Sequence, residues 1–255
     1  MTTSDQVISI SKLKTSCSTC SLHELCLPRG LNNIDLEKLD HVVKGSRPIQ
    51  KGDYLFRLND KFNAFYAVRS GSAKAYILNE LGEEQIIGFY FPGEVLGFDA
   101  MDQNVHTCFA MALETTTYCS LPYDRIHDIC IQIPELQKQM FRLISRELTN
   151  ENKMLLTINN RTAEERLATF LISLSTRLQK LGYSAIEFNL PMSRQEIANY
   201  LGLTIETVSR LLTKFQREQL IQIDKKEIKL TNLSELHSMC EGTRCPSAEG
   251  ENSVA

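Results

Sequence analysis

Short apolar runs separated by glycine turns fill residues 29–133. Runs rich in β-branched and aromatic side chains, such as those at 64–68 and 85–91, are followed by turns at Gly71 and Gly93. Many short strands with regularly spaced glycine turns are typical of a small antiparallel barrel or roll. This part of the chain is therefore predicted to be a β-roll domain, although nothing in the pattern says what it binds.

A long helix is predicted over residues 134–160. Pro134 suits its first turn, where the missing N–H costs no hydrogen bond. Along this helix, one stripe repeats at spacings of three and four residues, which is the heptad pattern of two helices packing side by side. The stripe consists of Phe141, Ile144, Leu148, Glu151, Leu155 and Ile158. Packing on the chain's own domain remains an alternative, but the narrow stripe with polar flanks favours a homodimer.

Glu151 interrupts this seam with a charge. In a symmetric dimer its two copies would approach each other, and like charges repel. We interpret this charge as weakening the seam, so that the dimer is only marginally stable. The balance between monomer and dimer can then be regulated.

Residues 161–236 are predicted to form a second domain that contains a winged helix-turn-helix. Ser193 and Glu196 have the spacing of a capping box at the start of one helix. Gly202 is free to take the positive φ of a tight turn, and Thr204 is a good N-cap for the next helix. The alternating pattern at 220–230 predicts a hairpin with a lysine-bearing tip, which suits a wing that touches phosphates.

Within the second helix of this unit, an apolar face is predicted at Ile205, Val208, Leu212 and Phe215. Glu206, Ser209 and Arg210 then lie together on the opposite face. These side chains suit the edges of DNA bases, because arginine can bond guanine and a carboxylate can accept from cytosine. A solvated Glu–Arg pair on a helix surface is the alternative.

Composition and charge are compatible with this interpretation. The chain has 255 residues, 42% hydrophobic and 23% charged, and lacks both a signal-peptide core and a run long enough to span a membrane. A cytoplasmic protein of two domains is expected. The net charge of −3 is unusual for a DNA-binding protein, but residues 161–230 carry 11 Lys/Arg and 8 Asp/Glu, a local net charge of +3. The tail at 237–255 is rich in polar residues, Gly and Pro, and is predicted to be disordered.

The chain has eight cysteines, which are not expected to form disulfides in a reducing compartment. Another role, such as metal binding or redox chemistry, is therefore expected for them. Three of them, Cys17, Cys20 and Cys26, are clustered in the irregular segment 1–28. Thiolates bind iron–sulfur clusters and zinc, but zinc would want a second close pair, and none lies near in the sequence. A cluster needs a fourth ligand, which the spacing leaves open among Cys108, Cys119, Cys130, Cys240, Cys245 and the nitrogen ligand His23.

The segments CSTCSLHELC, ETTTYC, NNRTAEERLA and NYLGLTIETVSRLL resemble the FNR proteins, the fumarate-and-nitrate-reduction regulators of the cyclic-AMP receptor superfamily. The resemblance spans roughly Cys17 to Leu230. It implies an α+β fold with an N-terminal β-roll sensor domain like those that bind cyclic nucleotides, a long dimerisation helix and a C-terminal winged helix-turn-helix. It also implies an oxygen-labile [4Fe-4S] cluster held by Cys17, Cys20, Cys26 and Cys119.

The resemblance further implies an oxygen-responsive global transcription regulator that activates or represses genes of anaerobic metabolism, and not an enzyme. Glu206, Ser209 and Arg210 match the family's base-reading residues, which implies double-stranded DNA with a palindrome like TTGAT-N4-ATCAA. The loop at 79–84 becomes a candidate contact for RNA polymerase. Ser21 and Leu25, beside the ligands, are expected to tune oxygen access to the cluster.

Two alternatives within the same superfamily are a regulator that responds to cyclic nucleotides and one that uses a thiol–disulfide switch. The superfamily's cyclic-nucleotide pocket has an arginine and a serine after a Gly-Glu turn. Here Gly93-Glu94 is followed by no arginine before Tyr123, and a phosphate without that partner binds poorly. An iron–sulfur enzyme is a third alternative, for which no acid–base pair or nucleophile arrangement is found.

Overall fold

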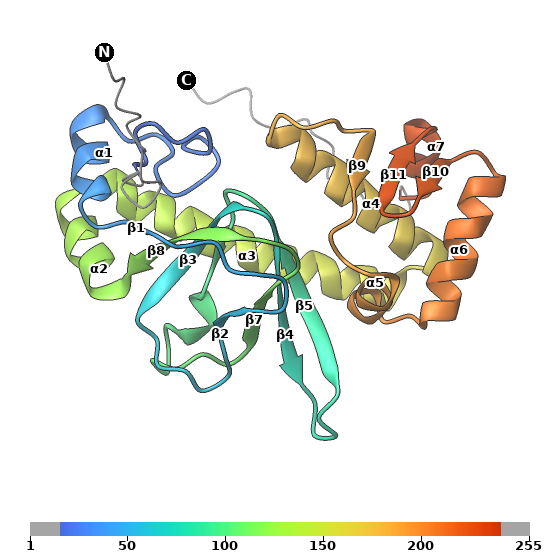
Figure 1. Cartoon of the computed structure of the whole chain (residues 1–255), viewed down its shortest axis with the longest axis horizontal. Coiled ribbons are helices and arrows are strands. Elements are labelled where there is room, and N and C mark those ends of the chain that lie inside the picture. The colour runs from blue at the N-terminus through green and yellow to red at the C-terminus, as the bar shows by residue number, and fades with distance from the viewer. Residues whose placement is uncertain (1–15, 241–255) are drawn as a thin grey trace, which may run out of the picture.

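The computed structural model describes residues 16–240 and has the expected α+β architecture (Figure 1). A β-roll is followed by a long helix and then by a smaller mixed domain. The cysteine-bearing segment lies at one end of the molecule and the smaller domain at the other, with the long helix running between them. The predicted disorder at 241–255 and the first fifteen residues of the cysteine-rich segment lie outside the described residues.

Two four-stranded antiparallel sheets form the β-roll, with strand orders β1-β8-β3-β6 and β2-β7-β4-β5. Alternating side chains of both sheets meet in the interior, where Phe56, Val68 and Ala110 are almost fully buried. The strands are β1 (Lys44–Gly45), β2 (Tyr54–Phe56), β3 (Ala64–Ser70), β4 (Ala73–Leu78), β5 (Glu84–Tyr90), β6 (Val95–Leu96), β7 (Phe109–Ala112) and β8 (Thr117–Pro122).

Helices close one end of the roll. They are α1 (Asn33–Asp40), α2 (Tyr123–Gln132), the 3-10 turn η2 (Phe98–Ala100) and the 27-residue α3 (Pro134–Asn160). The N-terminal half of α3 buries Leu136, Met140 and Leu143 in the same apolar cluster as α1 and α2. One face of α3 is therefore used within the chain, and the predicted seam lies on another.

The C-terminal domain packs four helices and a small sheet around one core that includes Leu171, Val208, Phe215 and Ile228. Capping boxes begin α4 at Thr162 and α5 at Ser193. Its elements are α4 (Ala163–Lys180), β9 (Glu187–Asn189), α5 (Arg194–Leu201), α6 (Ile205–Arg217), β10 (Ile221–Asp224), β11 (Glu227–Leu230) and α7 (Leu233–Ser238).

The described chain stays ordered beyond residue 237, where the composition predicted a disordered tail. Helix α7 continues to Ser238, and Cys240 is 1% exposed. The Cys240 thiol donates to the carbonyl of Leu236 at 3.2 Å and accepts from the Thr169 hydroxyl on α4 at 3.6 Å. Leu236 and Cys240 join the core under α4, and this burial offsets the polar composition of the segment.

Helix α5 also packs against strand β5, so the two domains touch. The Ile86 N–H donates to the Asn199 side chain at 2.6 Å, and that side chain donates back to the Glu84 carbonyl at 2.5 Å. Buried Lys74 on β4 pairs with Glu84 and, at 3.1 Å, with Glu196 on α5. Of the helices within residues 16–240, none combines the length and hydropathy needed to cross a membrane.

Candidate functional site

The cysteine loop, residues 16–31, is a chain of turns without helix or strand. Backbone hydrogen bonds close its turns, from Cys20 N–H to the Cys17 carbonyl at 3.2 Å and from Cys26 N–H to the Leu22 carbonyl at 3.0 Å. The carboxylate of Asp40, at the end of α1, accepts from the Cys17 N–H and from the Ser16 hydroxyl at 2.6 Å. The thiols are thus held by local turns and by one link to α1.

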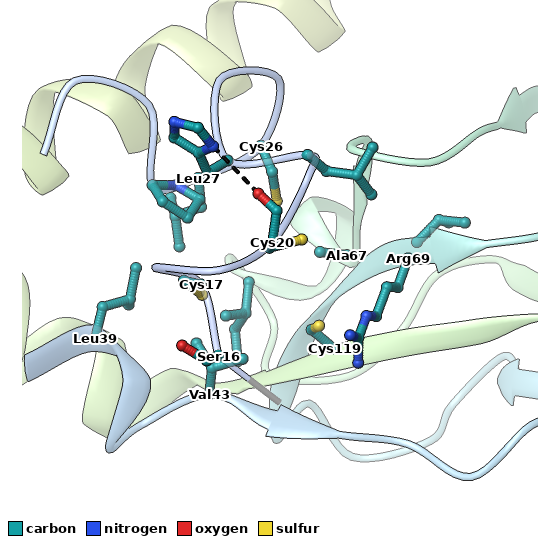
Figure 2. Close-up of a pocket in the computed structure, with 15 residues that line it drawn as sticks. Ser16, Cys17, Cys20, Cys26, Leu27, Leu39, Val43, Ala67, Arg69 and Cys119 are labelled. Carbon is teal, nitrogen blue, oxygen red and sulfur yellow. Dashed lines mark hydrogen bonds between the residues drawn. The ribbon is translucent and has the colours of Figure 1, made fainter. Parts of the chain in front are cut away.

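Strand β8 brings a fourth cysteine to this loop. Cys119 pairs with Ala67 of β3 on one side and with Gly45 of β1 on the other. Figure 2 shows Cys17, Cys20 and Cys26 on the loop and Cys119 on the sheet around one shared space. The volume of this cavity is about 30 Å³. It is lined by Ser16, Cys17, Cys20, Leu22, His23, Cys26, Leu27, Pro28, Leu39, Val43, Ala67, Val68, Arg69, Cys119 and Leu121.

The other candidate fourth ligands lie elsewhere or are otherwise engaged. Cys108 is buried in the separate cluster between the two sheets, Cys130 lies on α2, and Cys240 lies in the C-terminal domain. Cys245 is outside the described residues. His23 lines the cavity, but its Nδ1 lies 3.1 Å from the Cys20 carbonyl and its Nε2 lies 2.8 Å from Glu24. Only Cys119 among the sulfur candidates of the described chain joins the three loop cysteines.

Neither residue expected to tune the site lines the cavity. Ser21 is exposed, and Leu25 is half-buried. A Cβ built on Gly93 would lie 3.1 Å from Leu25 Cβ, so Leu25 packs on the turn between β5 and β6. Leu22 and Leu27 are the leucines of the loop that line the cavity instead.

The cavity favours protonated thiols. Burial raises the pKa of Cys17 well above its usual value, and the nearby Asp40 and Cys26 raise it further. Burial raises the pKa of Cys26 to about 12 and also raises the pKa of Cys119, which Arg69 opposes. A metal group that binds here must displace protons from these thiols, so its binding will depend on pH.

The donor set fits an iron–sulfur cluster. Four thiols from two segments border the same apolar cavity, and no carboxylate is among its lining residues. In residues 16–240, no three His, Cys, Asp or Glu side chains come close enough to share a single metal ion. The four thiols are thus shown to share one cavity, without a group already arranged around a single ion.

Sequence reasoning missed Asp40 and Arg69. Asp40 accepts three hydrogen bonds from the start of the loop, from the Cys17 N–H and from the hydroxyls of Ser16 and Ser18. Arg69 lines the cavity beside Cys119, as Figure 2 shows. Along the sequence, Asp40 is more than twenty residues from Cys17, and Arg69 is more than twenty residues from Cys119. No local pattern could therefore have identified them.

A second candidate site is the outer face of α6. The helix buries Val208, Leu212 and Phe215, and Thr204 caps it by accepting from the Thr207 N–H at 3.2 Å. Ile205, predicted to be buried, is 36% exposed, whereas Leu211, which is not among the predicted residues, is buried. Ile205 lies in the first turn of α6, at the edge of the packed surface of the domain, and is therefore partly exposed.

Glu206 and Arg210 are exposed on this face, and Ser209 is half-buried. No ion pair joins Glu206 to Arg210 within the part of the chain that the structure describes, so the solvated-pair alternative gains no support. A shallow groove beside them is lined by Ser209, Arg210, Thr213, Lys214 and Arg217. Helix α6 thus presents hydrogen-bonding groups flanked by cations, the residue types that read and bind DNA.

The predicted seam on α3 is largely open to solvent in the single chain. Phe141 is 65% exposed, Leu148 is 56% and Leu155 is 59%. Glu151 is exposed, and Ile144 and Ile158 are half-buried. Exposed apolar side chains grouped on one helix face, interrupted here only by Glu151, are typical of a surface that a partner covers.

Family models match both halves of the chain. Residues 46–132 match the cyclic nucleotide-binding domain, which is the β-roll, and residues 165–239 match the Crp-like helix-turn-helix domain. Among solved structures, FixK2 from Bradyrhizobium japonicum is similar, with a TM-score of 0.71 and 28% identity over 78% of this chain and 97% of that one. A CooA variant from Carboxydothermus hydrogenoformans, 20% identical with a TM-score of 0.65, shares the fold.

Curated relatives align over nearly their whole length. The transcriptional activator protein Anr of Pseudomonas protegens is 46% identical over 227 residues, covering 89% of this chain and 93% of that protein. The fumarate and nitrate reduction regulatory protein of Vibrio cholerae is 44% identical, covering 86% of this chain and 88% of its own length. The chain therefore belongs to the FNR family of the cyclic-AMP receptor superfamily, and is a transcription regulator and not an enzyme.

Proposed function

We propose that this regulator binds a [4Fe-4S] cluster through Cys17, Cys20, Cys26 and Cys119 and reports the absence of oxygen by dimerising on DNA. The observation that carries this proposal is the meeting of four thiols, three from one loop and one from a distant strand, at a single cavity. Cysteine thiolates, three from one loop and one from a distant strand, are the ligands that iron–sulfur clusters use.

The residues of the chain provide the link between sensing and pairing. When bound, the cluster would supply a bond between loop and sheet that oxygen destroys. The loop cysteines and Cys119 would hold residues 16–31 against β8, whose apolar cluster also contains Leu136 and Leu143 of α3. We infer that this link sets how α3 presents its seam, so that Phe141, Ile144, Leu148, Leu155 and Ile158 pair with a second copy despite Glu151.

Pairing would bring two α6 helices to one palindrome. In dimeric helix-turn-helix proteins the two recognition helices contact half-sites one helical turn apart. Glu206, Ser209 and Arg210 would read the bases of a TTGAT-N4-ATCAA-like site, and the wing at Lys225–Lys226 would contact phosphates. The relatives' names describe transcriptional activation and fumarate and nitrate reduction, which supports a role in anaerobic gene regulation. The loop 79–84 would contact RNA polymerase.

A strictly anaerobic purification tests the proposal. We expect a coloured dimer that contains iron and acid-labile sulfide and that becomes a colourless monomer in air. Cys119→Ser should lose the iron, whereas the matched variant Cys130→Ser should keep it, because Cys130 lies on α2 away from the cavity. An anoxic preparation that is free of iron and still a tight operator-bound dimer would contradict the proposal. Operator binding that responds to cyclic nucleotides or to thiol oxidants in such a preparation would favour the corresponding alternative.

A further inference from the structure

The turn between β5 and β6 touches the cysteine loop on one side and the C-terminal domain on the other. Gly93 in this turn has φ +87° and lies so close to Leu25 that an added Cβ would be 3.1 Å from Leu25 Cβ. The base of the Leu25 side chain therefore packs closely on the backbone of Gly93, with no room for a larger residue. A shift of the cysteine loop toward this turn would press on the backbone of Gly93.

Hydrogen bonds within the β-roll fix Glu94, the residue after Gly93. The Phe91 N–H donates to its carboxylate at 2.9 Å, and the Glu94 carbonyl accepts from the Val68 N–H at 2.9 Å. Val68 also lines the cysteine cavity. The direction of the Glu94 carboxylate is thus set by the β-roll.

Arg177 of α4 binds this carboxylate with two nitrogens. Its Nε donates to Glu94 Oε1 at 2.9 Å, and its Nη2 donates to Glu94 Oε2 and to the Phe89 carbonyl. The guanidinium lies over the Phe91 ring, 4.5 Å from its centroid, and the side chain is 28% exposed. Two parallel bonds and a stacked face fix the orientation of the group far more than a single-point ion pair does. Helix α4 is consequently held in register with the turn.

We propose that Leu25, Gly93, Glu94 and Arg177 form a relay by which the cysteine loop positions the DNA-binding domain, separately from its effect on dimerisation. The inference rests on the proposed function only in taking the cysteine cavity as the sensing site. Arg177 lies near the C-terminal end of α4, and α6 packs on the same helix in the domain core. Arg177 therefore acts as a positioning residue for α6.

A residue beside the same turn also contacts α3, the helix that carries the predicted dimer seam. The hydroxyl of Tyr90 donates to Glu147 Oε1 on α3 at 2.5 Å, and Glu147 is one residue before Leu148 of the seam. Burial raises the pKa of Glu147, which Tyr90 opposes and the neighbouring Glu94 reinforces. The relay and the seam are therefore in contact but can be separated experimentally, because the hydrogen bonds of Arg177 join only the branch that leads to α4.

A double-mutant cycle between Leu25→Ala and Arg177→Gln tests the relay. Operator affinity is measured by fluorescence anisotropy on the anaerobically purified full chain, at protein concentrations where the measured mass is that of the dimer. We expect Leu25→Ala to weaken binding about tenfold alone and less than twofold in the Arg177→Gln background, because the relay is already cut there. Arg177→Gln should leave iron content and dimer mass unchanged.

Lys180→Gln is the matched control, because it removes the same charge from an exposed position of the same helix. In that background Leu25→Ala should keep its tenfold effect. Additive effects of Leu25 and Arg177, or no effect of either, would overturn the relay. Glu94→Gln replaces Arg177→Gln if thermal melting shows that the arginine variant is unfolded. Iron analysis tests the proposed function independently, and the double-mutant cycle can be measured on iron-free protein as well.

Discussion

At the scale of single residues, the surroundings of each cysteine decide what its thiol can do. Seven cysteines of the described chain are free, but only four border one cavity. Cys108 is as buried as Cys17, yet it lies between the two sheets beside Asp99, and the pKa of its thiol is raised mainly by burial. A buried thiol that faces a packed core behaves as a small apolar side chain. Sharing a cavity with other thiols distinguishes a candidate ligand from such a residue.

Base recognition also belongs to this scale. Glu206→Ala should relax discrimination at one base pair of the operator by about 1–3 kcal/mol, because the carboxylate no longer accepts from a base edge. Affinity for unrelated DNA should rise slightly, since one negative charge near the phosphates is removed. Anisotropy titrations on the operator and its single-substitution variants, at one salt concentration, measure both effects.

Glu218→Ala is the control for this prediction, because it removes the same charge just past the end of α6. It should raise non-specific affinity without changing the preference between operators. Unchanged discrimination in Glu206→Ala would show that this carboxylate does not read a base.

At the scale of elements, α3 has two apolar faces with different uses. Leu136, Met140 and Leu143 are buried against the chain's own β-roll, whereas Phe141, Leu148 and Leu155 are more than half exposed. A helix that packs only on its own domain would leave its second face polar. The exposed stripe thus supports pairing of α3 with a second copy, and Glu151 lies within the surface that such pairing would bury.

Glu151→Ala should strengthen dimerisation of the iron-free protein about tenfold, since each dimer would lose a pair of facing carboxylates. Sedimentation equilibrium of the iron-free protein measures the monomer–dimer constant. Lys153→Ala, on the exposed flank of the same helix, should change the constant by less than twofold. If Glu151→Ala leaves the constant unchanged, the seam is not weakened by this charge.

At the scale of the whole molecule, contacts between the β-roll and the C-terminal domain set how the DNA-reading helix is held. Arg177 and Glu94 form one contact, and the polar cluster of Lys74, Glu84 and Glu196 forms another. Phe89 of β5 packs on Tyr200 of α5, with ring centroids 5.0 Å apart. The first two contacts involve charged groups, so the stability of this arrangement should depend on pH and salt.

Glu196 is expected to make the stability of the folded chain depend on pH. Burial would raise its pKa, but hydrogen bonds from Ser193 and the charge of Lys74 outweigh burial, and the pKa in the folded chain lies below its ordinary value of 4.5. A lowered pKa means that the ionised group stabilises the fold above pH 4.5, and that this contribution is lost as the pH falls from there through the folded pKa. The urea midpoint of Glu196→Gln should therefore fall less than that of the wild type between pH 6 and about pH 3.5.

Glu80→Gln, in the exposed tip between β4 and β5, provides the comparison. Its urea midpoint should follow the wild type over the same range. Equal pH dependence in Glu196→Gln and wild type would mean that this contact does not contribute to acid sensitivity.

Local features of the chain could be predicted without a structure. The capping box at Ser193, the turn at Gly202 and the cap at Thr204 depend on hydrogen bonds that reach only three or four residues, so their spacing in the sequence already contains them. The period of α3 and the grouping of Glu206, Ser209 and Arg210 follow from helix geometry in the same way. The three loop cysteines could be found because they lie within ten residues.

Contacts between distant segments were decided by the tertiary structure. The spacing of the cysteines left six candidates for the fourth ligand, and the strand register that places Cys119 beside the loop depends on pairing with residues 52 and 74 positions away. Asp40, Arg69, the ordered Cys240 and the bond from Arg177 to Glu94 likewise join parts that no local pattern relates. Periodicity and caps record neighbours along the chain, whereas the site and its link to the DNA-binding domain depend on which surfaces pack together once the whole chain has folded.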